Sequence, residues 1–144
     1  MSEFTAEFFG TFLLLLLGLG TNANVALNTT FGQNSGWIVI SFGWGLSVFA
    51  AVAVAGPYSG AHINPAVTIG LASASLFAWS EVPSFLLAQV LGGATGTTLV
   101  WLVFKDHFAS TKDQGTKLGV FSTGPAIKNY PINFLSEMTR TFVL

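Results

Sequence analysis

The residues best suited to specific chemistry in this chain are Asn64, Pro65 and Ala66. An Asn-Pro pair favours the start of a helix, because Asn caps free backbone N–H groups and Pro has no N–H to lose at the first helical position. The apolar stretch that follows, residues 65–77, would reach about 20 Å as a helix, which is less than the hydrocarbon core of about 30 Å. Irregular backbone at membrane depth survives only where it is buried in protein or lines an aqueous path. The pattern therefore predicts a pore lined by a half-helix.

Composition narrows the class of protein. The 144 residues are 51% hydrophobic and 8% charged, with a formal net charge of -1. Soluble domains carry about 25% charged residues, so this is predicted to be a membrane protein, and without a basic face a nucleic-acid partner is not expected. The chain has no cysteine, which excludes disulfides and thiolate catalysis. Two histidines and six acidic residues offer no nucleophile–base pair or metal constellation, so neither an enzyme, a metal site nor a cofactor is predicted.

Apolar and polar segments divide the chain. Three segments are long enough to cross a bilayer as helices: residues 4–27, 37–56 and 84–104. Gly56 and Pro57 are expected to end the second of these, and residues 1–104 to form a first repeat. Residues 105–131 carry Lys, Asp, Ser, Gly and Pro and are expected to form one long extramembrane loop. Residues 132–144 begin a fourth span that stops after about three turns, so the chain is expected to be truncated.

Residues 134–144 repeat the pattern of residues 4–14, including a Glu within an otherwise apolar helix. The identical pairs are Phe4 and Phe134, Glu7 and Glu137, Thr11 and Thr141, Phe12 and Phe142, and Leu14 and Leu144. Three spans separate the copies, so the second must enter the membrane in the opposite orientation. Inverted repeats of this kind are typical of transporters, whose discontinuous helices meet near the midplane. The Asn64 half-helix would be the first of such a pair, and the second would lie beyond Leu144.

The segments 59–70 and 6–11 closely resemble the major intrinsic protein family, which comprises aquaporins and aquaglyceroporins. The resemblance covers the whole chain and implies an all-α membrane protein with an aquaporin-like helical bundle. It implies that this chain holds the first inverted repeat, with its re-entrant half-helix, and the start of the second. It also implies a homotetramer at full length. Trp44 and the stretch 120–125 look like those of the bacterial glycerol uptake facilitators.

The resemblance implies roles for the loop before the half-helix. The side-chain amide of Asn64, in the motif with Pro65 and Ala66, would donate to a permeating oxygen, while the positive end of the short helix opposes cations. An acceptor strip would consist of the backbone carbonyls of Gly60, Ala61 and His62. Ordinary structural explanations also exist, namely a helix cap for the Asn and a tight turn for the Gly. The imidazole itself is expected to act as a structural hydrogen-bonding group.

Two further pairs of residues receive roles from the resemblance. Trp44 and Val48, one helical turn apart, would form an apolar wall against the carbon edge of a polyol, and the alternative is a packing or interfacial tryptophan. Glu7 and Glu137 are ionisable residues within spans. Each carboxylate would accept backbone N–H bonds from its re-entrant loop and hold that loop open. Exposure near a helix end is the alternative, and it suits Glu7 better.

The orientation in the membrane also follows from the resemblance. It implies a multi-pass protein of the plasma membrane, with the N-terminus and the Asn64 loop on the cytoplasmic side. The positive-inside rule alone would instead place the lysine-bearing segment 105–131 in the cytoplasm. Asn22 and Asn24 are expected to mark the point where the first helix approaches water.

The predicted function is a passive channel that lets glycerol, similar small uncharged polyols and water cross the lipid bilayer. A water-selective aquaporin is one alternative. Another is a non-conducting truncated fragment, because the chain holds one half-helix and not the filter arginine that the resemblance implies for the second half. A secondary active transporter is less favoured, because Glu7 is the one ionisable residue within the three complete spans.

Overall fold

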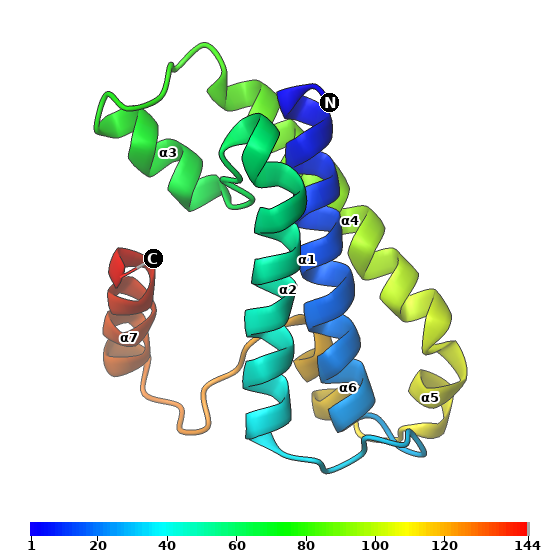
Figure 1. The fold of residues 1–144 in the computed structure, drawn as a ribbon. Helices are drawn as coiled ribbons and strands as arrows, with labels where there is room; N and C mark the ends of the chain where they lie inside the picture. Colours follow the sequence, from blue (N-terminus) through cyan, green and yellow to red (C-terminus); the bar gives the residue numbers. More distant parts are fainter. Residues whose placement is uncertain (144) are drawn as a thin grey trace.

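The computed structural model describes residues 1–143, and these residues form helices and connections without any strand (Figure 1). The helices are α1 (Glu3–Ala26), α2 (Trp37–Ser59), α3 (Pro65–Ser73), α4 (Val82–Val103), α5 (Lys105–Ser110), α6 (Gln114–Phe121) and α7 (Tyr130–Val143). By length and composition, α1, α2 and α4 can each cross a membrane. The predicted all-α membrane fold is confirmed.

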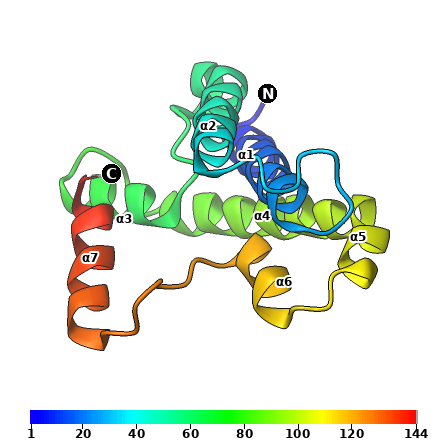
Figure 2. The ribbon, with the colours of Figure 1, turned by 90° about the horizontal axis from the view of Figure 1, so that it is seen from below.

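Helix α1 is the centre of the bundle and packs against both α2 and α4 (Figure 2). Two glycines of α4 allow the α1–α4 approach. A Cβ on Gly92 would overlap the carbonyl oxygen of Phe8, and a Cβ on Gly96 would lie 2.6 Å from the carbonyl oxygen of Phe12. The Gly-x-x-x-Gly spacing thus lets two helix backbones come close together, which is how membrane helices gain packing contacts.

The short helix α3 enters and leaves the bundle at one end. In Figure 1 the chain turns back after α2, α3 begins at mid-height, and the connection to α4 returns to the end where α1 starts. The nine residues of α3 extend about 14 Å. This helix is therefore re-entrant and does not cross the bundle.

Helix α3 ends at Ser73, so the end predicted at residue 77 is wrong. Ser75 has a φ of 61°, in the left-handed region. Its N–H donates to the carbonyl of Ala72, and the N–H of Leu76 donates to the carbonyl of Leu71. This pair of bonds is a Schellman motif, which stops a helix by satisfying its last carbonyls.

Helix α2 continues through Pro57 to Ser59, so the end predicted at Gly56 is also wrong. Proline removes one hydrogen bond from the last turn. The helix still closes, because the N–H of Gly60 donates to the carbonyl of Gly56 at 3.1 Å. Gly60 has a φ of 78°, which glycine adopts without a steric penalty, so the chain turns there.

The segment 105–131, predicted to be a loop throughout, contains α5 and α6. Asp113 caps α6: its Oδ2 accepts the backbone N–H and the hydroxyl of Thr116 at 2.6 and 2.7 Å. These bonds, the hydroxyl's first, hold the pKa of the Asp113 carboxyl below its usual range. Near the other end of α6, Val120 is fully buried in a cluster with residues of α1. The connection is therefore structured where it meets the bundle.

In the view of Figure 1, α7 runs upward whereas α1 runs downward. None of its described residues is buried. Glu137 Oε1 accepts a hydrogen bond from Arg140 Nη1 at 2.7 Å, and both side chains are exposed. Leu144, the last residue of the predicted repeat, lies outside the described residues.

Substituting Gly92→Ala tests the close approach of α1 and α4. The added Cβ meets backbone and not a flexible side chain, so the free energy of unfolding should fall by about 1–3 kcal/mol. Thermal unfolding in detergent, followed by circular dichroism, measures this. Gly20→Ala in α1 is the matched control, because a Cβ at Gly20 meets no atom within 4 Å. Equal losses in both variants would contradict the packing argument.

Candidate pore site

Glu7 of α1 binds the loop that precedes α3. Its Oε1 accepts the backbone N–H of His62 at 2.9 Å, and its Oε2 accepts the backbone N–H of Ile63 at 2.7 Å. The Glu7 side chain is fully buried, which excludes the exposed position near a helix end. A buried carboxylate is costly unless it is hydrogen-bonded, so the carboxylate and the loop amides stabilise each other.

Two more side chains complete the surroundings of this carboxylate. The Ser59 hydroxyl donates to Oε1 of Glu7 at 2.6 Å, and Gln89 Nε2 donates to Oε2 at 2.8 Å. Gln89 Nε2 also lies 3.0 Å from Oγ1 of Thr68. Because these residues come from α2, α4 and α3, one hydrogen-bond network joins all four helices of the bundle.

The loop backbone adopts conformations that are unfavourable for most residues. Gly60, Ala61 and Ile63 have φ values of 78°, 53° and 42°. For residues other than glycine each such position costs about 1–3 kcal/mol, and a β-branched residue there is an outlier. The Ile63 side chain is buried beside Gly10 of α1, where an added Cβ would lie 2.7 Å from Ile63 Cγ2. Burial and the bond to Glu7 therefore hold Ile63 in its strained conformation.

The hydrogen bonds of this loop are one-sided. Every N–H group of residues 60–63 donates to the protein, and the acceptors are the Gly56 carbonyl, the Ser59 hydroxyl and the Glu7 carboxylate. The carbonyl oxygens of residues 60–63 accept no hydrogen bond from any part of the chain between residues 1 and 143. The loop thus has a row of carbonyl acceptors without a partner among the described residues.

Asn64 caps α3, and Pro65 occupies the first position of the helix. The Asn64 Oδ1 accepts the N–H of Ala66 at 2.8 Å, and the Asn64 backbone is extended. Because Oδ1 is engaged in the cap, the Nδ2 group is the donor that the side chain can offer outward. The Asn64 side chain therefore serves as a helix cap and keeps a donor at the start of α3.

The imidazole of His62 is packed among aromatic rings. Its ring centroid lies 4.7 Å from that of Phe77 and 4.8 Å from that of Phe85. Its Nδ1 lies 3.1 Å from Oγ1 of Thr68. These contacts are those of a structural side chain that fixes the loop against α3 and α4.

Trp44 and Val48 lie on α2, apart from the loop that follows the end of this helix. The Trp44 indole packs against α1, where a Cβ on Gly18 would lie 2.6 Å from the ring. Its Nε1 donates to Asn22 Oδ1 at 3.1 Å. The Val48 side chain is 44% exposed. The predicted apolar wall therefore lies on α2 itself, whereas the row of acceptors lies in the connection that follows α2.

The structure does not bring Glu137 to the loop, since this residue lies on exposed α7 and pairs with Arg140. Sequence reasoning missed the polar residues that support the loop and the indole: Ser59, Thr68, Gln89 and Asn22. Gln89 could have been found, because it is a large polar residue within an apolar span. The others carry no such signal, because Ser and Thr are common in membrane helices and Asn is common near helix ends.

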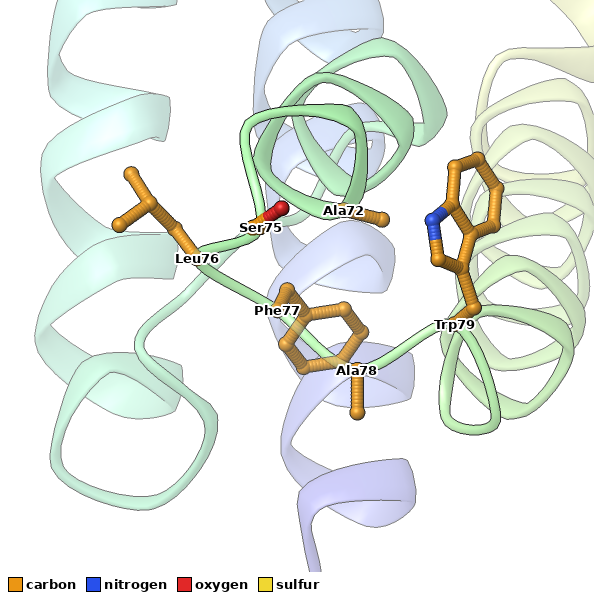
Figure 3. A pocket seen from close by; sticks show the side chains of 6 residues that line it. All are labelled: Ala72, Ser75, Leu76, Phe77, Ala78 and Trp79. Carbon is orange, nitrogen blue, oxygen red and sulfur yellow. The ribbon is translucent and has the colours of Figure 1, made fainter.

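A hollow of about 450 Å³ lies at the other end of α3 (Figure 3). Its lining residues are Ala72, Ser75, Leu76, Phe77, Ala78 and Trp79. It is separate from the row of acceptors, which lies before the start of α3. Between residues 1 and 143, no three His, Asp or Glu side chains are grouped closely enough to hold a metal ion.

Comparisons with known proteins identify the family. The model described as "Major intrinsic protein" matches residues 1–144, so the chain belongs to the major intrinsic protein family. A probable glycerol uptake facilitator protein of Thermotoga maritima is 52% identical over 144 residues, and the glycerol uptake facilitator protein of Bacillus subtilis is 47% identical over 144 residues.

These matches cover 100% of this chain but 62% and 53% of the two relatives, so the chain spans only part of their length. Among solved structures, the X-ray structure of the aquaglyceroporin from Plasmodium falciparum matches with a TM-score of 0.70 and 41% sequence identity. That match covers 75% of this chain and 43% of the other.

Substituting Glu7→Gln tests whether the carboxylate holds the loop. An amide can accept on one side only, so one loop N–H loses its partner and the free energy of unfolding should fall by about 2–3 kcal/mol. Hydrogen exchange at His62 and Ile63 should become faster. The control is Glu3→Gln, which changes an exposed acid on the same helix. Unchanged exchange at both amides in the Glu7 variant would contradict this role.

Proposed function

We propose that these residues form part of a passive transmembrane channel for glycerol, other small uncharged polyols and water. The observation that carries the proposal is the one-sided hydrogen bonding of residues 60–63, whose N–H groups are all engaged while their carbonyls are not. Acceptors in a row suit a molecule whose hydroxyl groups must exchange water for other partners during passage. The names of the relatives from Thermotoga maritima and Bacillus subtilis support the same substrate.

Selection would rest on matching the two edges of a polyol. Hydroxyl groups would donate to the carbonyls of Gly60, Ala61 and His62 and accept from Asn64 Nδ2. Carbon atoms would pass along an apolar wall that includes Trp44 and Val48. The N-terminus of α3 carries a partial positive charge, so cations would be opposed without any charged side chain. Pro65 and Ala66 would shape the narrow point at which this helix begins.

The remaining parts of the proposal concern the assembled protein. The channel would use neither covalent chemistry nor energy coupling, and it would lie in the plasma membrane as a multi-pass homotetramer with a cytoplasmic N-terminus. Glu137 would support a second re-entrant loop as Glu7 supports the first. A water-selective channel is the competing function, and it shares the same loop geometry.

Glycerol flux distinguishes these two channels. The test joins residues 1–144 to the remaining part of the Thermotoga maritima relative and reconstitutes the family-length protein in liposomes. Stopped-flow light scattering should record glycerol entry well above that of empty liposomes, because both the acceptor strip and the apolar wall come from this chain. Sucrose should stay excluded. Water flux without glycerol flux would favour the water-selective alternative and contradict the proposal.

The chain of 144 residues, reconstituted alone, should conduct neither glycerol nor water. It supplies one re-entrant half-helix, whereas inverted-repeat folds build their permeation site from two. The same light-scattering assay measures this, and the family-length protein is the positive control. Glycerol flux from the chain alone would show that a single repeat suffices to build the pathway.

A further inference from the structure

Asn22 uses both ends of its side-chain amide at once. Its Oδ1 accepts the indole N–H of Trp44 at 3.1 Å, and its Nδ2 donates to the carbonyl of Val120 at 3.2 Å. The amide oxygen accepts and the amide nitrogen donates. Rotating the amide by 180° would therefore place its nitrogen against the indole N–H and its oxygen against the Val120 carbonyl, and both bonds would be lost. The orientation of Asn22 is therefore fixed by two partners that are far apart in the sequence.

Both partners of Asn22 belong to one packed cluster. Val120 of α6 is fully buried, and Leu19 and Ala23 of α1 are in the same cluster. Trp44 packs against this cluster from α2. The Asn22 amide thus joins α1, α2 and α6 at the point where the indole lies.

The Trp44 indole also packs closely against Gly18 of α1. The face at Gly18 has no room for even one added carbon, since a Cβ there would lie 2.6 Å from the ring. Contact with Gly18 limits how far the ring can move toward α1, and the bond to Asn22 fixes its rotation. Together they restrict how the Trp44 ring can move and rotate.

Asn24 shows that this arrangement is specific. It lies on the same helix, but its Oδ1 accepts the backbone N–H of Gly32 at 3.4 Å and so serves the connection between α1 and α2. Both asparagines lie in the last two turns of α1, but the side-chain amide of Asn22 also bonds to α2 and α6.

We propose that Asn22 is a positioning residue for permeant selection: it fixes the Trp44 indole and ties it to α6. This inference rests on the proposed function, in which Trp44 is part of the apolar wall. When the Trp44 ring is restrained in this way, it limits the width of the molecules that can pass along the proposed path. Through the carbonyl of Val120, that limit depends on the structured segment after α4 and not on the membrane helices alone.

The first experiment measures selectivity in the family-length protein described above. Asn22→Ala removes the bonds to Trp44 and Val120, and the loss of the Trp44 bond should lower the ratio of glycerol to ribitol permeability by about twofold to tenfold. Trp44→Phe, which removes the indole N–H, should lower the ratio too. The double variant should lower the ratio by less than the product of the two single effects, because both changes break the Asn22–Trp44 contact. Asn24→Ala is the matched control and should leave the ratio unchanged.

A second experiment tests the contact without relying on conduction. The 144-residue chain is labelled with ¹⁵N-tryptophan in detergent, and the Trp44 indole signal is assigned as the one lost in Trp44→Phe. Asn22→Ala should shift this signal and speed its hydrogen exchange, whereas Asn24→Ala should not.

An unshifted Trp44 signal in Asn22→Ala, or a selectivity ratio equal to that of Asn24→Ala, would overturn the positioning role. If the unsubstituted family-length protein passes no glycerol, the proposed function fails and the selectivity consequence falls with it. The indole signal still decides whether Asn22 holds Trp44, so the two failures are distinguishable.

Discussion

The structure depends on one buried carboxylate that accepts hydrogen bonds from a strained loop. Without Glu7, the backbone N–H groups of His62 and Ile63 would be buried without acceptors, and the left-handed conformation of Ile63 would lose its main restraint. The same carboxylate is stable in an apolar bundle only because four donors surround it. Loop and carboxylate are therefore mutually necessary, and the start of α3 follows from both.

Satisfying the loop amides from within the protein has a direct chemical result. A backbone segment without proline has equal numbers of donors and acceptors, so engaging only the donors leaves the acceptors without a protein partner. In most loops such carbonyls would face bulk water. Here they belong to a loop that dips into an apolar bundle, where unpaired carbonyls need a polar neighbour such as the path proposed above. The polarity of the proposed path is thus set by the backbone and needs no charged side chain.

The sequence predicted the fold well and the supporting contacts poorly, for physical reasons. The membrane spans are defined by composition, and the start of α3 is defined by Asn64 before Pro65. Both can therefore be predicted from short stretches of sequence. The end of α3 has no local signal in the sequence, because Ser75 occupies the left-handed position that glycine usually marks. Pro57 predicts a helix end, but a proline in the last turn of a helix costs only one hydrogen bond, so α2 continues to Ser59. The sequence does not distinguish Asn22 from Asn24, because the partners of Asn22 lie 22 and 98 residues further along the chain.

The unbroken course of α1 has one more consequence. Glu7 and Asn22 both lie on α1, about 22 Å apart along the helix axis at about 1.5 Å per residue. Because Glu7 binds the loop of residues 60–63 and Asn22 binds Trp44, α1 fixes the spacing between that loop and the indole. Inserting or deleting one residue between them would rotate one contact relative to the other by about 100°. Length changes tolerated in the surface connections should therefore be absent from this interval in working relatives.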